Sequence, residues 1–322
     1  MSQHWAAIGE AGALSGLRIM VWVYRTLGRR AFNAVLGPVM LYYLMRRPLA
    51  RKASRDYLKR VYGRYPKAFK RKPGLGATYL HFFNFGQALL DKYVAWFDPP
   101  SDIPMNLQEK ELLFAVAQSG KGCLMIGSHF GNLEYARCVA HRHPNLVTNI
   151  LVHDKHAAKF AALFTDGAPQ SRLNLIQVTE LDIELSLRLK QKVDAGEWLL
   201  IAGDRVPVGL GPNVASAEFF GARAAFPIGP YVLARLLRCP VYLMHCFMLG
   251  DDYRLGFEFF ADEIRPSRTN RGTSYADEVQ RYACALEAQV SKAPLQWFNF
   301  YDFWGKSTMQ VQAEGSREQA FD

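Results

Sequence analysis

The feature that most constrains the fold is a series of short apolar segments that alternate with helical patterns between residues 105 and 305. Short apolar runs separated by helices are typical of strands that are covered on both faces of a sheet. The alternation therefore predicts an α/β domain with a mostly parallel sheet flanked by helices. The expected strands are 123–128, 146–153, 173–178, 197–203 and 240–249, and the expected helices are 132–142, 154–164, 181–195 and 227–238.

The last part of the domain has other patterns. Residues 254–261 alternate between apolar and polar side chains, which predicts an antiparallel strand at an edge of the sheet. In residues 273–292 the apolar positions recur at spacings of three and four, which predicts an amphipathic helix that Pro294 ends. The polar tail, residues 306–322, is expected to be flexible.

The basic residues are concentrated in the N-terminal quarter of the chain. Residues 1–72 hold 16 Lys and Arg but only Glu10 and Asp56, whereas the whole chain has a net charge of +10. Such a segment predicts an anionic partner, either a nucleic acid or the phospholipid head groups of a membrane. Its aromatic residues lie in apolar runs and do not alternate with the basic ones, so a membrane surface is favoured and no nucleic acid is expected.

Two apolar runs within this quarter predict a membrane-associated helical leader over residues 1–47. The run 11–24 has a single charge, and the run 31–45 has none and is flanked by arginine pairs. A helix over the second run would be about 22 Å long, shorter than the ~30 Å core of a bilayer, and Pro38 would kink it. We therefore expect a shallow hairpin or an interfacial anchor, with two buried core helices as the alternative. Residues 48–104 are expected to form a helical basic segment.

The cysteines predict neither a disulfide framework nor a zinc site. There are five, scattered along the chain without a CxxC motif. This pattern is typical of a protein in a reducing compartment. His153 and His156 flank Asp154, but no matching third ligand is evident, so we expect no metal site there.

A histidine and an acid lie close together where the first expected strand ends. His129 follows strand 123–128, Glu134 lies five residues later, and Gly131 permits a tight turn between them. An acid in this position can accept a hydrogen bond from one ring nitrogen and leave the other free to take a proton. The pair would supply a base and its orienting group, with the nucleophile coming from the substrate. From spacing alone, a surface histidine near a helix start is the competing interpretation.

A second pair of charged residues follows another expected strand. Asp204 and Arg205 come directly after strand 197–203. Because the carboxyl ends of parallel strands meet at one edge of a sheet, we expect both side chains near His129. Arg205 could bind a phosphate or stabilise a developing oxyanion. An ion pair that caps the following loop is the equal alternative.

The sequence GSHFGNLE, residues 127–134, resembles the SHFGNWE-type motif of the lipid A late acyltransferases, within the lysophospholipid acyltransferase superfamily and its His-x4-acid signature. The resemblance runs from about residue 10 to 305 and includes the basic, apolar N-terminus and the blocks AGDRVPVG and FFGARAAFPIGPYVLARLLRCPV. Leu133 replaces the usual Trp, and the segment LVHDKHAAKF departs from the Arg-containing pattern of the family. The opening HWAAIGE is similar to a specialised branch associated with aryl polyene lipids.

The resemblance implies an acyltransferase in which His129 is the general base and Glu134 steadies it. The remaining site residues would bind the substrate or, through backbone N–H groups, its oxyanion: Phe130, Gly131, Asn132, Asp204 and Arg205. The donor would be a fatty acyl thioester of acyl carrier protein or CoA, and the acceptor a hydroxyl or amine of a membrane lipid or glycolipid. Neither a metal nor an organic cofactor is implied, and the place of action would be the cytoplasmic face of the inner membrane.

Two other classes of function stay open on the residues. In a thioesterase or another hydrolase, His129 would activate water. In a non-catalytic membrane-binding or assembly protein, His129 would have no chemical role. The aromatic segment QWFNFYDFW, residues 296–304, is expected to pack in the core or against the membrane, with contact to an acyl chain as the alternative.

Overall fold

The computed structural model describes the chain in the following ranges: 11–97, 103–136, 146–152, 173–177, 183–206, 213–250, 252–269 and 272–305. The helix expected at 154–164, the histidines of the HDKH segment and the tail 306–322 lie outside the described residues. Most of the helix expected at 132–142 also lies outside them, and its described part is the short 3₁₀ helix η3 (Leu133–Ala136).

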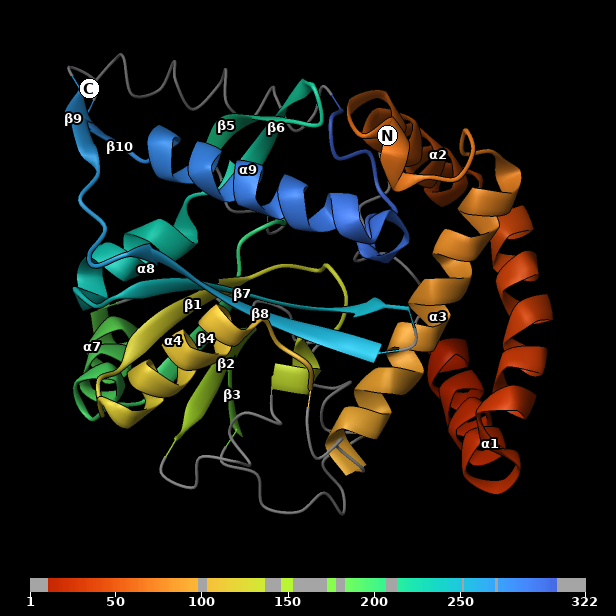
Figure 1. Cartoon of the computed structure of the whole chain (residues 1–322), viewed down its shortest axis with the longest axis horizontal. Coiled ribbons are helices and arrows are strands. Elements are labelled where there is room, and N and C mark those ends of the chain that lie inside the picture. The colour runs from red at the N-terminus through yellow and green to blue at the C-terminus, as the bar shows by residue number, and fades with distance from the viewer. Residues whose placement is uncertain are drawn as a thin grey trace.

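A six-stranded sheet forms the centre of the molecule (Figure 1). Its strands are β1 (Cys123–Gly127), β2 (Thr148–Val152), β3 (Leu173–Gln177), β4 (Trp198–Ala202), β7 (Val241–Leu249) and β8 (Asp252–Ala261). They lie in the order β3-β2-β4-β1-β7-β8, and all neighbours are parallel except β7 and β8. The predicted α/β fold with a mostly parallel sheet and an antiparallel edge strand is therefore confirmed.

Helices cover both faces of this sheet. They are α4 (Leu107–Gln118), α7 (Ile183–Asp194), α8 (Gly229–Leu237) and α9 (Ala276–Lys292). Alternate residues of a strand point to opposite faces. In β1, accordingly, Leu124 and Ile126 join the core on the side of α9, whereas Met125 joins the core on the side of α4. Figure 1 shows α9 and α4 on opposite sides of the strands.

Two small antiparallel pairs accompany the sheet, and the sequence patterns did not predict them. β5 (Val214–Phe219) and β6 (Ala222–Pro227) form a hairpin whose Phe219 and Phe226 are fully buried. β9 (Ser267–Thr269) pairs with β10 (Gly272–Ser274). The first pair escaped prediction because its strands are rich in alanine and carry charged residues, so they do not form apolar runs.

Three N-terminal helices form a separate layer: α1 (Ala11–Arg46), α2 (Pro48–Arg64) and α3 (Leu75–Phe97). A short 3₁₀ helix, η2 (Pro66–Ala68), follows α2. α1 consists of two helices joined at Gly28, whose φ of 78° and ψ of 180° are readily adopted only by glycine. The predicted pair of short apolar helices is thus present. The break lies at Gly28, between the two apolar runs, and Pro38, where a kink was expected, stays inside the second helix.

One side of α1 is packed and the other is exposed. Its packed side meets α3 in a core cluster that includes Phe32, Leu36, Phe82 and Leu90. Its large exposed apolar side chains are Ile19, Trp22, Leu27, Val35, Leu41, Tyr42 and Met45. None of the helices in the described part of the chain combines the length and the apolar character needed to cross a bilayer.

The helical layer stands at the carboxyl end of the parallel strands. α3 packs against η3, which follows β1, and against η4 (Pro294–Gln296) near the C-terminus (Figure 1). The loops that leave β1 and β4 therefore lie between the sheet and the helices. The division of the chain at residues 47, 104 and 305 stays a prediction.

Candidate active site

The loop that carries His129 is held tightly between β7 and the C-terminal segment. Gly131 has a φ of +67°, and a Cβ at this position would lie 2.0 Å from the carbonyl oxygen of Cys246. The N–H of Gly131 donates to the carbonyl of Gln296 at 2.8 Å, and that of Asn132 donates to the carbonyl of Cys246 at 2.7 Å. A residue with a side chain would not fit at position 131, so the predicted tight turn depends on glycine.

His129 pairs with Asp204, which comes from the neighbouring strand. Nδ1 of His129 lies 2.8 Å from Oδ1 of Asp204, and the backbone N–H of His129 donates to Oδ2 at 3.0 Å. β4 carries Asp204 to this place because it lies beside β1, and the N–H of Gly203 donates to the carbonyl of Gly127. The sequence placed Asp204 and His129 at the same edge of the sheet, and the structure agrees.

Asp204 is a buried carboxylate with several donors. It is fully buried, and the indole Nε1 of Trp297 donates to its Oδ2 at 2.9 Å. Burial by itself raises the pKa of this carboxyl group. The adjacent His129 and Arg205, together with the hydrogen bond from Trp297, outweigh burial and lower the pKa to about 2. Asp204 is therefore ionised at neutral pH and acts only as an acceptor.

The ring of His129 is neutral at the same pH. Burial lowers its pKa, the positive charge of Arg205 lowers it further, and the carboxylate of Asp204 opposes both. Because Asp204 can only accept, the ring proton lies on Nδ1 and Nε2 is unprotonated. Nε2 makes no hydrogen bond within the described part of the chain, and 39% of the side chain is exposed. The ring can therefore take a proton from a group outside the protein.

Glu134, the acid predicted to orient His129, is not the residue that does so in the structure. The hydrogen bonds of the ring and backbone N–H of His129 go to Asp204. Glu134 lies in η3 and is half-buried, and its backbone N–H donates to Oδ1 of Asn132 at 3.2 Å. In the structure, Asp204 is therefore the acid that orients the ring of His129. A catalytic role of Glu134 stays a prediction.

The backbone N–H groups expected to form an oxyanion hole already have acceptors. That of Phe130 donates to Oγ of Ser128 at 3.3 Å, and those of Gly131 and Asn132 donate to the backbone carbonyls that hold the loop. The prediction of an oxyanion hole at these three groups is therefore wrong for this structure. A different donor is free there. Nδ2 of Asn132 is buried and has no hydrogen-bond partner among the residues that the structure describes.

Arg205 is half-buried beside the His129–Asp204 pair. Its guanidinium donates to the carbonyl of Phe298. Its charge lowers the pKa of both His129 and Asp204, and Lys92 of α3 also lowers that of His129. The positive charges of Arg205, on the loop after β4, and of Lys92, on α3, thus both act on the ring of His129. This arrangement favours an anionic substrate group next to His129.

Elsewhere in the described part of the chain, Glu109, His245 and Glu258 form a group that could hold a metal ion. One ligand atom from each of Glu109, His245 and Glu258 lies within 4.8 Å of the others. Burial, and then the positive charge of Lys292, lowers the pKa of His245 to about 3. Nothing else in the described residues points to a metal ion there, and we assign no metal role to this group.

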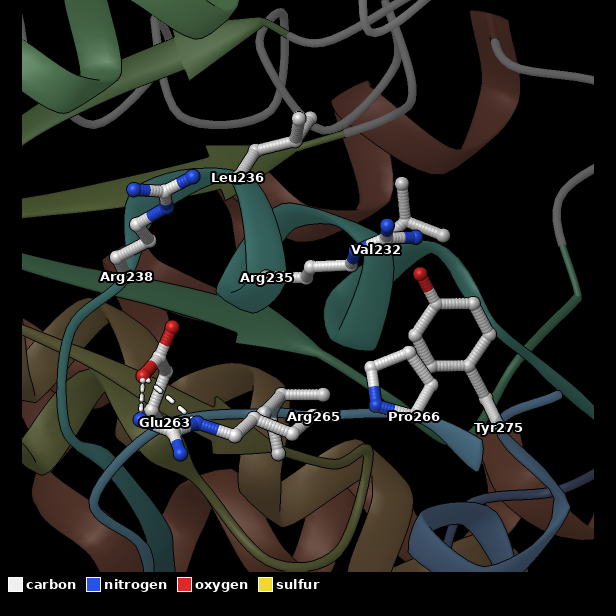
Figure 2. Close-up of a pocket in the computed structure, with 9 residues that line it drawn as sticks. Val232, Arg235, Leu236, Arg238, Glu263, Arg265, Pro266 and Tyr275 are labelled. Carbon is white, nitrogen blue, oxygen red and sulfur yellow. Dashed lines mark hydrogen bonds and ion pairs between the residues drawn. The ribbon is translucent and has the colours of Figure 1, made fainter. Parts of the chain in front are cut away.

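A surface pocket of about 610 Å³ has residues of α8 and of the segment after β8 in its lining (Figure 2). The pocket lies between the end of α8 and the segment after β8, close to the residue where β7 begins. β7 runs parallel to β1, and His129 follows the last residue of β1, so the pocket and His129 are at opposite ends of these strands. Its charged lining residues are Arg235, Arg238, Glu263 and Arg265, and Figure 2 shows Glu263 paired with Arg265. Its position separates it from the chemistry of His129.

Trp297 is the site residue that sequence reasoning did not find. The aromatic segment was expected to pack, and Trp297, Phe298 and Phe303 are indeed buried. No periodicity or spacing indicates that an indole N–H from this segment would reach a carboxylate near residue 204. The fold alone brings the two together.

A family model described as bacterial lipid A biosynthesis acyltransferase matches residues 12–306. The match covers most of the chain and includes His129, Asp204 and Trp297. It agrees with the resemblance carried by the motif GSHFGNLE. No curated protein matches the sequence.

Proposed function

The chain belongs to the bacterial lipid A biosynthesis acyltransferase family and is an acyltransferase, and we propose that His129 is its general base. The substrates would be a fatty acyl thioester and a hydroxyl or amine of a lipid or glycolipid. The observation that carries this proposal is the state of the ring: Nδ1 is held by Asp204, and Nε2 is unprotonated and faces no partner in the described residues.

The proposed reaction proceeds by direct transfer. Nε2 of His129 removes the proton of the acceptor as its oxygen or nitrogen attacks the carbonyl carbon of the thioester. The C–S bond then breaks, and the leaving sulfur takes the proton from the imidazolium. Asp204 stabilises the imidazolium while it exists, as the carboxylate of a Ser-His-Asp triad does. General-base assistance of this kind contributes about 10²–10⁴ in rate.

The cations near His129 support binding of a phosphate-bearing substrate. The pantetheine arm of acyl carrier protein and of CoA carries phosphate, as do many lipid acceptors. Arg205 and Lys92 are close enough to His129 to lower its pKa. Nδ2 of Asn132 has no acceptor within the described ranges, which supports the expected role of that residue in substrate binding, because a buried donor without an acceptor is costly.

The exposed side of α1 supports attachment to a membrane surface. Exposed arginines, Arg30 and Arg46, lie close in the chain to its exposed apolar side chains. An amphipathic surface of this kind lies in the head-group region, where the apolar side chains enter the acyl boundary and the arginines meet phosphates. We propose that the enzyme acts at the cytoplasmic face of the inner membrane, as the family resemblance implies.

The test is transfer of a radiolabelled acyl chain from acyl carrier protein or CoA to a lipid extract, with wild type and His129→Ala compared. Label in a lipid product that disappears in the variant supports the proposal. Release of free fatty acid alone, with or without acceptor, would indicate a thioesterase. Mass spectrometry of the labelled product identifies the acceptor and the acyl length.

A further inference from the structure

The C-terminal segment 296–299 runs between the His129 loop and the helical layer. The N–H of Phe298 donates to the carbonyl of His129 at 3.2 Å, and Phe130 and Trp297 form an antiparallel bridge. The side chain of Gln296 exchanges two hydrogen bonds with the backbone of Met248, at 2.8 and 2.6 Å. The segment is therefore fixed on both sides, and the position of Trp297 is fixed with it.

The indole of Trp297 determines how the carboxylate of Asp204 is turned. Trp297 is 1% exposed, and its Nε1 donates to the same Oδ2 that accepts the backbone N–H of His129. With both donors on Oδ2, the other oxygen is left to face Nδ1 of the His129 ring. An indole can only donate, so this contact keeps Oδ2 as an acceptor.

The backbone of Trp297 is held from the opposite side by His81 of α3. Nε2 of His81 lies 2.9 Å from the carbonyl oxygen of Trp297, and Nδ1 lies 2.8 Å from Oγ of Ser54 in α2. The carbonyl can only accept, so Nε2 carries the proton and Nδ1 accepts from the hydroxyl. Burial lowers the pKa of the fully buried His81 to about 4, so this arrangement persists at neutral pH.

We propose that Trp297 is a positioning residue for catalysis, held by His81, which connects the helical layer to the carboxylate that orients His129. The inference rests on the proposed function of His129. A purely structural role is the competing explanation, because Trp297 also packs in an aromatic cluster. The centroid of its ring lies 5.3 Å from that of Phe219 and 4.9 Å from that of Phe303. If Trp297 is a positioning residue, loss of its N–H alone lowers kcat. If its role is purely structural, loss of the N–H with the ring kept leaves kcat unchanged.

The test is Trp297→Phe, which keeps an aromatic ring and removes the donor. We expect kcat to fall about 10-fold to 100-fold with little change in KM for the acyl donor, because substrate contacts are kept. We also expect the acidic limb of the rate profile to move to higher pH. Without its donor, the carboxylate is more basic and holds the imidazolium proton more strongly.

Trp304→Phe is the matched control. The indole of Trp304 lies in the same aromatic cluster, 6.2 Å from that of Trp297, and donates to the carbonyl of Phe219 at 3.2 Å. This control loses an indole hydrogen bond without touching Asp204, so its kcat and pH profile should stay near those of wild type. Equal kcat and pH profiles for the two variants would overturn the proposal.

Two further measurements keep the test decisive. If Trp297→Phe does not fold, benzothienylalanine at position 297 replaces the N–H by sulfur in a ring of nearly the same shape. The same loss of kcat is expected there, and full activity would refute the positioning role. His129→Ala separates the two proposals. An inactive His129→Ala beside a fully active benzothienyl enzyme rejects only the role of Trp297, whereas an active His129→Ala rejects the proposed base itself.

Discussion

The sheet edge and the helical layer each contribute a histidine with a lowered pKa, and Trp297 joins the two. His129 has a carboxylate on Nδ1 and an open Nε2, whereas both nitrogens of His81 bond neutral groups in a fully buried place. Burial makes both rings neutral at pH 7. A neutral ring is therefore not sufficient for a general base. His129 differs from His81 in two ways: a carboxylate can stabilise its protonated form, and a substrate can reach its exposed Nε2.

The largest effect should come from His129→Ala. We expect acyl transfer to fall by at least about 10³-fold, because the variant lacks the proposed general base. The fold should persist, since the side chain of His129 is partly exposed and belongs to none of the buried core clusters of the described residues. His81→Gln is the contrasting variant, because glutamine can still donate to the carbonyl of Trp297, and it should keep most of the activity. Near-normal transfer by His129→Ala would remove the mechanism.

The next effect separates the two acids near His129. Asp204→Asn should lower kcat about 10²-fold to 10⁴-fold, because an amide cannot stabilise the imidazolium and favours the wrong tautomer. Glu134→Gln should lower kcat by less than about tenfold, because the ring of His129 bonds Asp204. Both are measured by single-turnover transfer, with circular dichroism as the check of folding. A larger loss for Glu134→Gln would restore Glu134 as the orienting acid.

Asp204 and Glu134 also show which parts of the site the sequence can predict. The strands were predictable because short, continuous apolar runs are stable as strands of a sheet that is covered on both faces. The same argument put Asp204 and His129 at one edge. The partner of the histidine was misassigned, because five residues of separation in the chain suggested Glu134, whereas the adjacent strand β4 supplied a residue 75 positions away.

In the helical layer, the sequence predicted one short helix over each apolar run and a kink at Pro38 within the second. The helix continues through Pro38, and the break lies between the two runs at Gly28, where φ is positive. The contact between Trp297 and Asp204 was not predictable, since it depends on how the C-terminal segment crosses between two layers. Such contacts are properties of the assembled fold and leave no local pattern.

A smaller effect concerns the exposed side of α1. Replacing Trp22, Leu27 and Met45 by Ser should weaken binding to vesicles of anionic phospholipid by about 10-fold to 100-fold, because less apolar surface enters the interface. Sedimentation with the vesicles measures this. Leu187→Ser is the control, since that side chain is 59% exposed but belongs to α7 of the α/β domain. Equal binding by all variants would show that α1 does not contact the membrane.

The smallest effect is a shift of the pH profile by Arg205. His129 must be neutral to accept a proton, and its pKa is already below the ordinary histidine value of about 6.5 because of burial and of Arg205. Activity should therefore be lost as the pH falls through that lowered pKa. Arg205→Gln removes a positive charge that disfavours the imidazolium. The pKa of His129 should rise, and the acidic limb of kcat/KM should move to higher pH by up to about one unit.

Arg205→Lys is the control, because it keeps the positive charge and should leave the acidic limb in place. Its activity should still fall, because the planar fork of the guanidinium is lost. If Arg205→Gln moved the limb to lower pH, or left it unchanged, the electrostatic coupling between the two side chains would be refuted.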